Sequence, residues 1–416
     1  MKSVLHGIGL SLLLAVAPTL AAQSHIPVGT PITFRISESV SSDTAMAGRA
    51  FHATVIGPVR LDERLLIAPG TKAFGHVARA GRDSAKRYML DLAFDSVAIA
   101  GGAVPVSVRV TAVDNARERV DSAGRIIGGA AARTLRSRRT WSMMALGLVH
   151  PVAAAALWSA STLGVRERDA RIRYPAGTDV MTVVTRDLVI RRAATHEAWN
   201  AVLRPDSLRH LIAGWPVHAS AEKGTVGADP INIALIGDSA TIVHAFRAAG
   251  WDVAARMGMK ADFATFLRAS ANRGYAHQPV STLLLDGRAP DLIFERVTNT
   301  MAKRHHIRLW RWTDRIDGES VWLASASHDV GIEYLRDRRH FTHRIDAAID
   351  AERDKVANDL WAADCIAQRS DVARSLPMDL RVNDGRDLVR TDGELVVLRL
   401  RAVAREDASR AVSSTR

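Results

Sequence analysis

A turn built from Pro, Gly and Thr recurs three times, and it narrows the fold of this 416-residue chain more than any other feature. Proline fixes φ before the turn and glycine permits a positive φ, so each copy is expected to lead the chain into a β-strand. The first and third copies precede similar strands, at 32–40 and 180–190. We therefore expect the third copy to close the same barrel or sandwich that the first one opens. The copies are Pro27-Val-Gly-Thr30, Pro69-Gly-Thr71 and Pro175-Ala-Gly-Thr178.

Residues 26–113 alternate short apolar stretches with glycine-marked turns, a pattern typical of an all-β domain. Together with the third turn, they predict a barrel-like or sandwich-like β domain over residues 23–190. The expected strands lie at 32–36, 51–56, 88–94 and 104–110.

An apolar insert at 135–166 interrupts this β domain. Trp141–Val165 contains no Asp, Glu, Lys or Arg, and 25 such residues are long enough to cross a bilayer. However, His150-Pro151 breaks the segment in its middle, and its small residues suit close contact between helices. Three interpretations stay open, in this order: a helical hairpin on the barrel surface, a segment that contacts a membrane, and a membrane span.

The first 22 residues have the pattern of a secretory signal peptide. Lys2 provides a positive start, residues 4–17 are apolar, and small residues end the segment at Ala22. The alternative is an uncleaved anchor, although the apolar core is short for a membrane span. The single cysteine, Cys365, permits no disulfide within the chain and is expected to be a small buried side chain. Export from a bacterial cell would place the protein in the periplasm or envelope.

The chain is strongly basic, with a formal net charge of +12. Arginine supplies 49 of its 56 basic residues, which could simply reflect genome composition. The functional interpretation is attraction to anionic partners such as phosphates or lipid head groups. No basic run is interleaved with aromatic residues, so nucleic acid is not favoured as a partner.

The second half changes from β to α/β character. Residues 191–227 are expected to connect the domains through a helix at 195–212 and a linker at 219–227. An α/β (α+β) domain follows at 228–402, and a disordered polar tail at 403–416. Asp238 or Ser239 is expected to cap its first helix, which Gly250 ends. Further helices are expected at 262–271 and 346–363, and strands at 231–237, 282–285, 292–297, 307–312, 321–325 and 395–400.

Six segments of the second half resemble, in order, the LssY C-terminal domain, from Asp229 to about Leu400. The resemblance implies a bacterial protein of the envelope or of a secretion locus, with no assigned activity. Some relatives carry a membrane domain resembling phosphatidic-acid phosphatases; it is missing from this chain, so that activity is not carried over. The first half resembles the conjugal-transfer TrbI-like β-barrel more distantly, which implies fold and location only. The six segments begin at Asp229, Ala245, His277, Arg304, Val321 and Thr342.

Two short segments of this domain are rich in histidine and acidic residues. Side chains alternate along the expected strand from Arg304, so His305 and His306 face opposite ways, and His306 shares its face with Arg308. The candidate catalytic residues are His306, His343, Asp346 and Asp350. His306, His343 and Asp346 are the candidate metal ligands, because imidazole and carboxylate together suit divalent Zn, Mn or Fe. A bound metal could activate water for hydrolysis.

A second interpretation of the same segments is an anion or phosphate site. Structural roles are also open: acids in the first turn of a helix are stabilised by its dipole, and Asp350 could pair with Arg353. Asx residues beside proline commonly hold turns. No HExxH, GxSxG or P-loop motif is present. The candidate ligand-binding residues are Arg304, Arg308, Arg353, Asp229 and Asn232.

These observations predict an exported envelope protein of two domains that binds an anionic small ligand or an envelope partner. The alternative function is a metal-dependent or His/Asp-dependent hydrolase, of the phosphoester class. A divalent metal is the one cofactor that the residues suggest, and membrane contact through Trp141–Val165 stays open.

Overall fold

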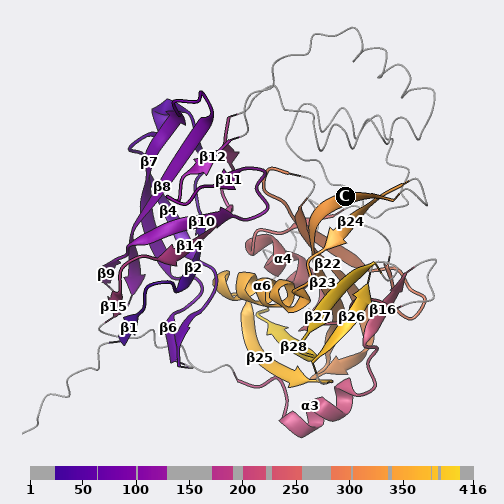
Figure 1. Cartoon of the computed structure of the whole chain (residues 1–416). Coiled ribbons are helices and arrows are strands. Elements are labelled where there is room, and N and C mark those ends of the chain that lie inside the picture. Colours follow the sequence, from indigo (N-terminus) through magenta and orange to yellow (C-terminus); the bar gives the residue numbers. More distant parts are fainter. Residues whose placement is uncertain are drawn as a thin grey trace, which may run out of the picture.

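The computed structural model describes two parts that pack side by side (Figure 1). The expected signal peptide, the Trp141–Val165 segment, the helix at 262–271 and the tail at 403–416 lie outside the described residues. In the part of the chain that is described, no helix is long and apolar enough to span a bilayer. The described residues are 24–62, 64–99, 102–128, 171–190, 200–221, 227–254, 283–300, 303–335, 340–375, 377–382 and 386–402.

The first part is a nearly closed, barrel-like sheet, as the turn repeat predicted. Its strands run in the order β10-β14-β2-β4-β7-β8-β12-β11, with β9 paired to β8. They are β2 (Pro31–Ile36), β4 (Ala50–Val55), β7 (Lys72–Arg82), β8 (Tyr88–Ile99), β9 (Gly102–Pro105), β10 (Val108–Val113), β11 (Arg119–Val120), β12 (Ile126–Ile127) and β14 (Asp179–Val184). Short pairs flank it: β1 (Ser24–Ile26) with β15 (Leu188–Ile190), β3 (Val40–Ser41) with β13 (Arg173–Tyr174), and β5 (Val59–Leu61) with β6 (Arg64–Ile67).

The three Pro/Gly/Thr turns share one backbone geometry. Gly29, Gly70 and Gly177 have φ values of 90°, 88° and 89°, which favour glycine. In each turn the threonine hydroxyl donates a hydrogen bond to the carbonyl three residues earlier. Strands β2 and β14, which follow the first and third turns, pair with each other in antiparallel fashion. The expectation that these two copies close one sheet is confirmed.

One expected strand of this part is divided in two. A single strand is expected at residues 104–110, but β9 pairs with β8 and β10 pairs with β14. The chain changes partner between Val106, whose N–H still donates to the Asp95 carbonyl, and Ser107, whose carbonyl accepts the Thr185 N–H.

The second part is built on a mixed sheet in the order β19-β21-β22-β23-β18-β28-β25, with β24 paired to β23. Only β18 and β28 pair in parallel among its described strands, so the α/β class expected here is not clearly met, and the described structure is mostly β. The strands are β18 (Ile233–Ile236), β19 (Asp252–Val253), β21 (Leu292–Arg296), β22 (Arg304–Ile316), β23 (Glu319–Leu335), β24 (His340–Ile345), β25 (Ile366–Ala373) and β28 (Glu394–Leu400).

Helices α4 (Ser239–Ala248) and α6 (Ile349–Ala362) bury their apolar side chains on one face of this sheet. Asp238 caps α4, since its carboxylate accepts the Thr241 N–H at 2.7 Å, and Gly250 follows the helix at a φ of 83°. Helix α3 (Pro205–Ile212) and a small sheet cover the other face. That sheet contains β16 (His218–Ala221), β17 (Gly227–Pro230) and β20 (Leu283–Leu284); the remaining pair is β26 (Met378–Val382) with β27 (Asp387–Thr391).

The connection between the parts differs from the expectation where it is described. The expected helix at 195–212 is described only from residue 200, and α3 begins at Pro205, a residue favoured in the first helical turn. Of the expected linker at 219–227, residues 219–221 lie in β16 and residue 227 begins β17, whereas residues 222–226 lie outside the described part of the chain.

Candidate functional site

The centre of the second part is the antiparallel pair β22–β23. His305 lies opposite His328, and His306 lies opposite Ser327. Side chains alternate along both strands, so these two pairs point to opposite faces of the sheet. Every residue from Arg304 to Trp310 is buried. Two separate buried polar clusters result, one on each face.

The first cluster, here called the Ser327 cluster, lies on the face away from α6. The Ser327 hydroxyl lies 2.8 Å from Asp229 Oδ2 and 2.8 Å from His306 Nε2. Arg304 Nε donates to Asp329 Oδ2 at 2.9 Å. The other members are Arg308, 3.5 Å from Asp229, and His343, whose Nδ1 lies 3.3 Å from Asp329.

Burial sets the charge states of the Ser327 cluster. It lowers the pKa of His306 well below its usual value and raises the pKa of Asp229. Burial also opposes ionisation of Asp329, but neighbouring positive charge, including the Arg304 guanidinium bonded to it, lowers its pKa to about 2. Ser327 is fully buried. This arrangement therefore serves as a polar network within the sheet rather than as an exposed nucleophile and base.

The structure does not bring the candidate catalytic and metal residues together. His306 and His343 both lie within 4 Å of Asp329. Asp346, however, lies 3.4 Å from His328 on the opposite face. Asp350 accepts hydrogen bonds from Thr391 Oγ1 at 2.9 Å and from the Asp392 N–H. The carboxylate that the two histidines share is Asp329, which was not among the residues selected from the sequence.

The candidate ligand-binding residues also separate. Arg304, Arg308 and Asp229 belong to the Ser327 cluster. Asn232 clamps β23, because its amide accepts the Ala326 N–H at 3.0 Å and donates to the Ala326 carbonyl at 3.2 Å. Its role in the described structure is to hold two strands. Arg353 lies elsewhere, on α6.

The second cluster, here called the interdomain network, joins the barrel-like part to the face of the sheet that carries α6. Asp179 on β14 contacts Arg35 on β2 at 2.7 Å, Lys355 on α6 at 2.7 Å and Arg296 on β21 at 3.1 Å. Asp359 on α6 contacts Arg35 at 2.7 Å. These contacts tie the two parts through charges that are almost fully buried.

His305 is the centre of one end of the interdomain network. Its Nδ1 lies 2.6 Å from Glu352 and its Nε2 lies 2.8 Å from Asp114 of the barrel-like part. Burial disfavours the charged ring, but Asp114 and Glu352 outweigh burial and raise the His305 pKa to about 9. The His328 ring stacks on His305 with centroids 4.3 Å apart. The Nε2 atom of His328 lies 2.8 Å from Asn115 Oδ1.

This end of the interdomain network was not predicted from the sequence. Alternation correctly placed His305 opposite to His306, on the face of Ile307 and Leu309, but no site was expected on that face. Nothing local to Asp114 indicated that it would meet a strand 191 residues further along the chain. The histidine doublet was the available signal, since it supplies a ligand-type side chain to each face.

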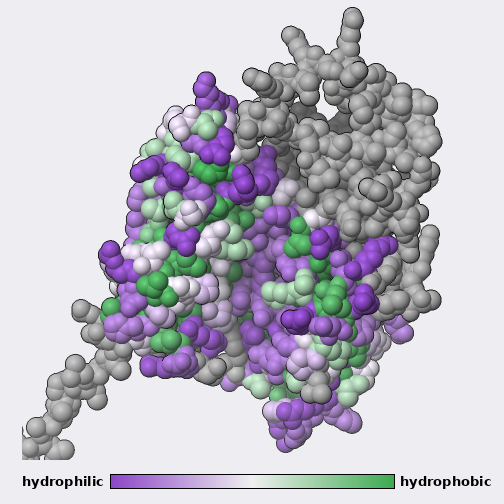
Figure 2. Space-filling model, viewed as in Figure 1, coloured by the Kyte–Doolittle hydropathy of each residue, from purple (hydrophilic) through white to green (hydrophobic). Residues whose placement is uncertain are grey.

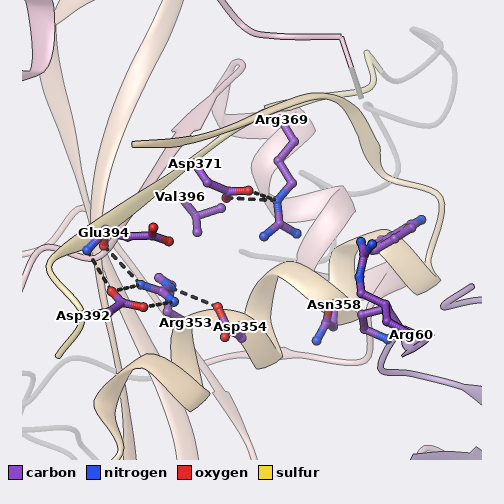
Figure 3. Close-up of a pocket in the computed structure, with 11 residues that line it drawn as sticks. Arg60, Arg353, Asp354, Asn358, Arg369, Asp371, Asp392, Glu394 and Val396 are labelled. Carbon is purple, nitrogen blue, oxygen red and sulfur yellow. Dashed lines mark hydrogen bonds and ion pairs between the residues drawn. The ribbon is translucent and has the colours of Figure 1, made fainter. Parts of the chain in front are cut away.

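A pocket of about 590 Å³ opens between the two parts. Figure 2 shows a mainly hydrophilic surface between the two lobes. In Figure 3, Arg353 and Asp392 lie toward one side of the pocket, and Arg60 and Asn358 toward the other. Arg353 holds Asp392 through two hydrogen bonds of 2.7 and 2.9 Å, and Arg369 Nε lies 3.1 Å from both oxygens of Asp371. The pocket is also lined by Pro58, Asp354, Trp361, Glu394 and Val396.

This geometry defines a class of mostly β protein. Its two parts are joined by buried ion pairs and line a charged pocket between them. Residues 216–395 match the family model described as LssY C-terminus. The chain therefore carries an LssY C-terminal domain, in agreement with its sequence motifs. No curated protein matches the chain.

Proposed function

We propose that this chain is an exported envelope protein that binds a small polar ligand in the pocket between its two parts. The proposal rests on the pocket, because residues from both parts line it and its volume of about 590 Å³ is typical of small-molecule sites. Arg60 comes from the barrel-like part, whereas Arg353 and Arg369 come from the LssY C-terminal domain. A ligand bound there would contact both parts at once.

The lining narrows the ligand class. Three arginines face four carboxylates, those of Asp354, Asp371, Asp392 and Glu394. Two of the arginines already hold carboxylates, so a purely anionic ligand would have to displace Asp392 or Asp371. A zwitterion can pair its anionic group with a guanidinium and its ammonium with a carboxylate. We therefore favour an amino acid or a short peptide over a simple anion.

The envelope location is supported by residues 1–22, which have the pattern of a signal peptide. It is also supported by the association with envelopes and secretion loci that the LssY C-terminal domain implies. A hydrolase has less support, because its candidate residues His306, Asp346 and Asp350 lie in three different places. Fractionation of cells producing the full chain tests the location: recovery in the periplasm or envelope is expected, and recovery only in the cytoplasm would contradict it.

The ligand proposal is tested by calorimetric titration of the whole protein with glutamate, lysine, dialanine and inorganic phosphate. We expect at least one of the three zwitterions to bind, and phosphate alone to bind weakly or not at all. Asn358 lines the pocket and is half-buried, so Asn358→Trp should fill the space and weaken binding at least tenfold.

Arg209→Gln is the matched control, because Arg209 is exposed, pairs with Asp206 and does not line the pocket. Its affinity should equal that of the unchanged protein. Equal affinities for the Asn358→Trp protein and the control would place the ligand elsewhere. Binding of phosphate in preference to every zwitterion would reject the ligand class.

A further inference from the structure

We infer that Asp114, His305 and His328 form a binding site for one divalent metal ion that links the two parts of the chain. Each residue offers a ligand atom, and these atoms all lie within 4.8 Å of one another. Asp114 follows β10 of the barrel-like part, whereas the histidines face each other across β22 and β23. Two imidazoles and a carboxylate suit Zn, Mn or Fe.

The surroundings orient both histidines as metal ligands. Glu352 lies 2.6 Å from His305 Nδ1, and Asp346 lies 3.4 Å from His328 Nδ1. Carboxylates in these positions can hold the Nδ1 proton while an ion takes the place of the Nε2 proton, as around many metal-bound histidines. Both Nε2 atoms face the barrel-like part, 2.8 Å from Asp114 Oδ2 and 2.8 Å from Asn115 Oδ1. The Asn115 carbonyl oxygen could supply a fourth ligand.

The charge balance of the interdomain network also favours a divalent cation. When His305 is neutral, as a metal-bound histidine must be, the five carboxylates of the network exceed its permanently positive side chains by two. In addition, Glu352 Oε1 is buried without a hydrogen-bond partner, which is costly for a carboxylate. One divalent ion would neutralise the excess. The carboxylates are those of Asp114, Asp179, Asp346, Glu352 and Asp359, and the cations are Arg35, Arg296 and Lys355.

The burial of the site indicates what the ion would do. Asp114 and His305 are buried and His328 is half-buried, so little room is left for a substrate. An ion bound roughly 2.0–2.2 Å from each ligand atom would require Asp114 and His305, hydrogen-bonded at 2.8 Å, to move slightly apart. Because the ligands come from both parts, the ion would hold the barrel-like part on the LssY C-terminal domain. This role is separate from ligand binding in the pocket.

The test is metal analysis of the full-length protein purified without chelator, followed by calorimetric titration of the chelator-treated protein with Zn²⁺ and Mn²⁺. We expect one ion per chain, and a lower melting temperature after chelation because the ion binds only the folded state. His328→Gln and Asp114→Asn should lose the ion. His218→Gln is the control, because His218 is half-buried on β16, and it should keep the ion.

Circular dichroism separates loss of the ion from loss of the fold, and if Asp114→Asn fails to fold, His328→Gln decides. The inference is overturned if the chelator-treated protein binds neither ion in titration. It is also overturned if His328→Gln binds as tightly as the unchanged protein. Loss of the ion in His306→Gln but not in His328→Gln would move the site to the Ser327 cluster.

Discussion

Asp179 is one of two buried carboxylates that meet the same three basic side chains where the two parts touch. Its carboxylate is buried and meets Arg35, Arg296 and Lys355. Burial opposes its ionisation, but these three cations outweigh burial and hold its pKa well below the usual value. Such a network is not a large net source of stability, because its charges have lost most of their water. Removing one member, however, leaves the others buried and uncompensated.

We predict that Asp179→Asn lowers the free energy of unfolding by about 3–5 kcal/mol, the cost of breaking a buried ion pair. Urea unfolding followed by tryptophan fluorescence measures the loss. Asp121→Asn is the matched control: Asp121 pairs with Arg125 at the surface of the same part, and such pairs contribute at most about 1 kcal/mol. Equal losses in the two proteins would show that the buried network does not hold the parts together.

At the scale of elements, the Pro/Gly/Thr turns set how the barrel-like sheet closes. Gly29 and Gly177 place β2 and β14 side by side, although about 150 residues separate the two turns along the chain. The left-handed conformation at each glycine is favourable only because no Cβ is present. A Cβ at either position would therefore strain the turn without meeting another atom.

We predict that Gly29→Ala lowers the free energy of unfolding by about 1–2 kcal/mol, the cost of a left-handed conformation for an L-residue. Thermal unfolding monitored by circular dichroism at 218 nm (a wavelength for β structure) reports the change. Gly57→Ala is the control, since Gly57 also has open space around its Cβ position but no positive φ. It should be neutral or slightly stabilising. A loss in Gly57→Ala as large as in Gly29→Ala would contradict the turn argument.

At the scale of the whole molecule, burial keeps several histidines neutral. It lowers the pKa of His218, His306, His328 and His343 below the usual 6.5. The unfolded chain would bind protons at these rings below pH 6.5, whereas the folded chain would not. Protonation therefore favours unfolding as the pH falls. His305 behaves differently: its pKa is raised to about 9, so it is charged in both states below pH 6.5.

We predict that the free energy of unfolding falls between pH 7 and pH 5, by up to about 1.4 kcal/mol per pH unit for each neutral histidine. Guanidinium unfolding at pH 7, 6 and 5, with chelator present throughout, measures the slope. His218→Gln should make the slope shallower. A free energy of unfolding that stays constant or rises over this range would show that the four rings are not kept neutral.

Features with a local cause were determined by the sequence alone. The glycine turns, the Asp238 cap and the buried run at Ile233–Ile236 depend on neighbouring residues only, and all were predicted. Ordered motifs likewise predicted the LssY C-terminal domain. Alternation along the strand that begins at Arg304 also placed His305 and His306 on opposite faces of the sheet.

Only the tertiary structure decided what each of those histidines meets. His306 and His343 share Asp329, whereas Asp346, expected on a helix one turn after His343, lies on the other face of the sheet. His305 meets Asp114 from the other part of the chain. Spacing along a strand determines the face of a side chain, but the packing of distant elements determines what covers that face. For this reason the sequence identified the segments that form the candidate site, whereas the tertiary structure determined which side chains those segments contact.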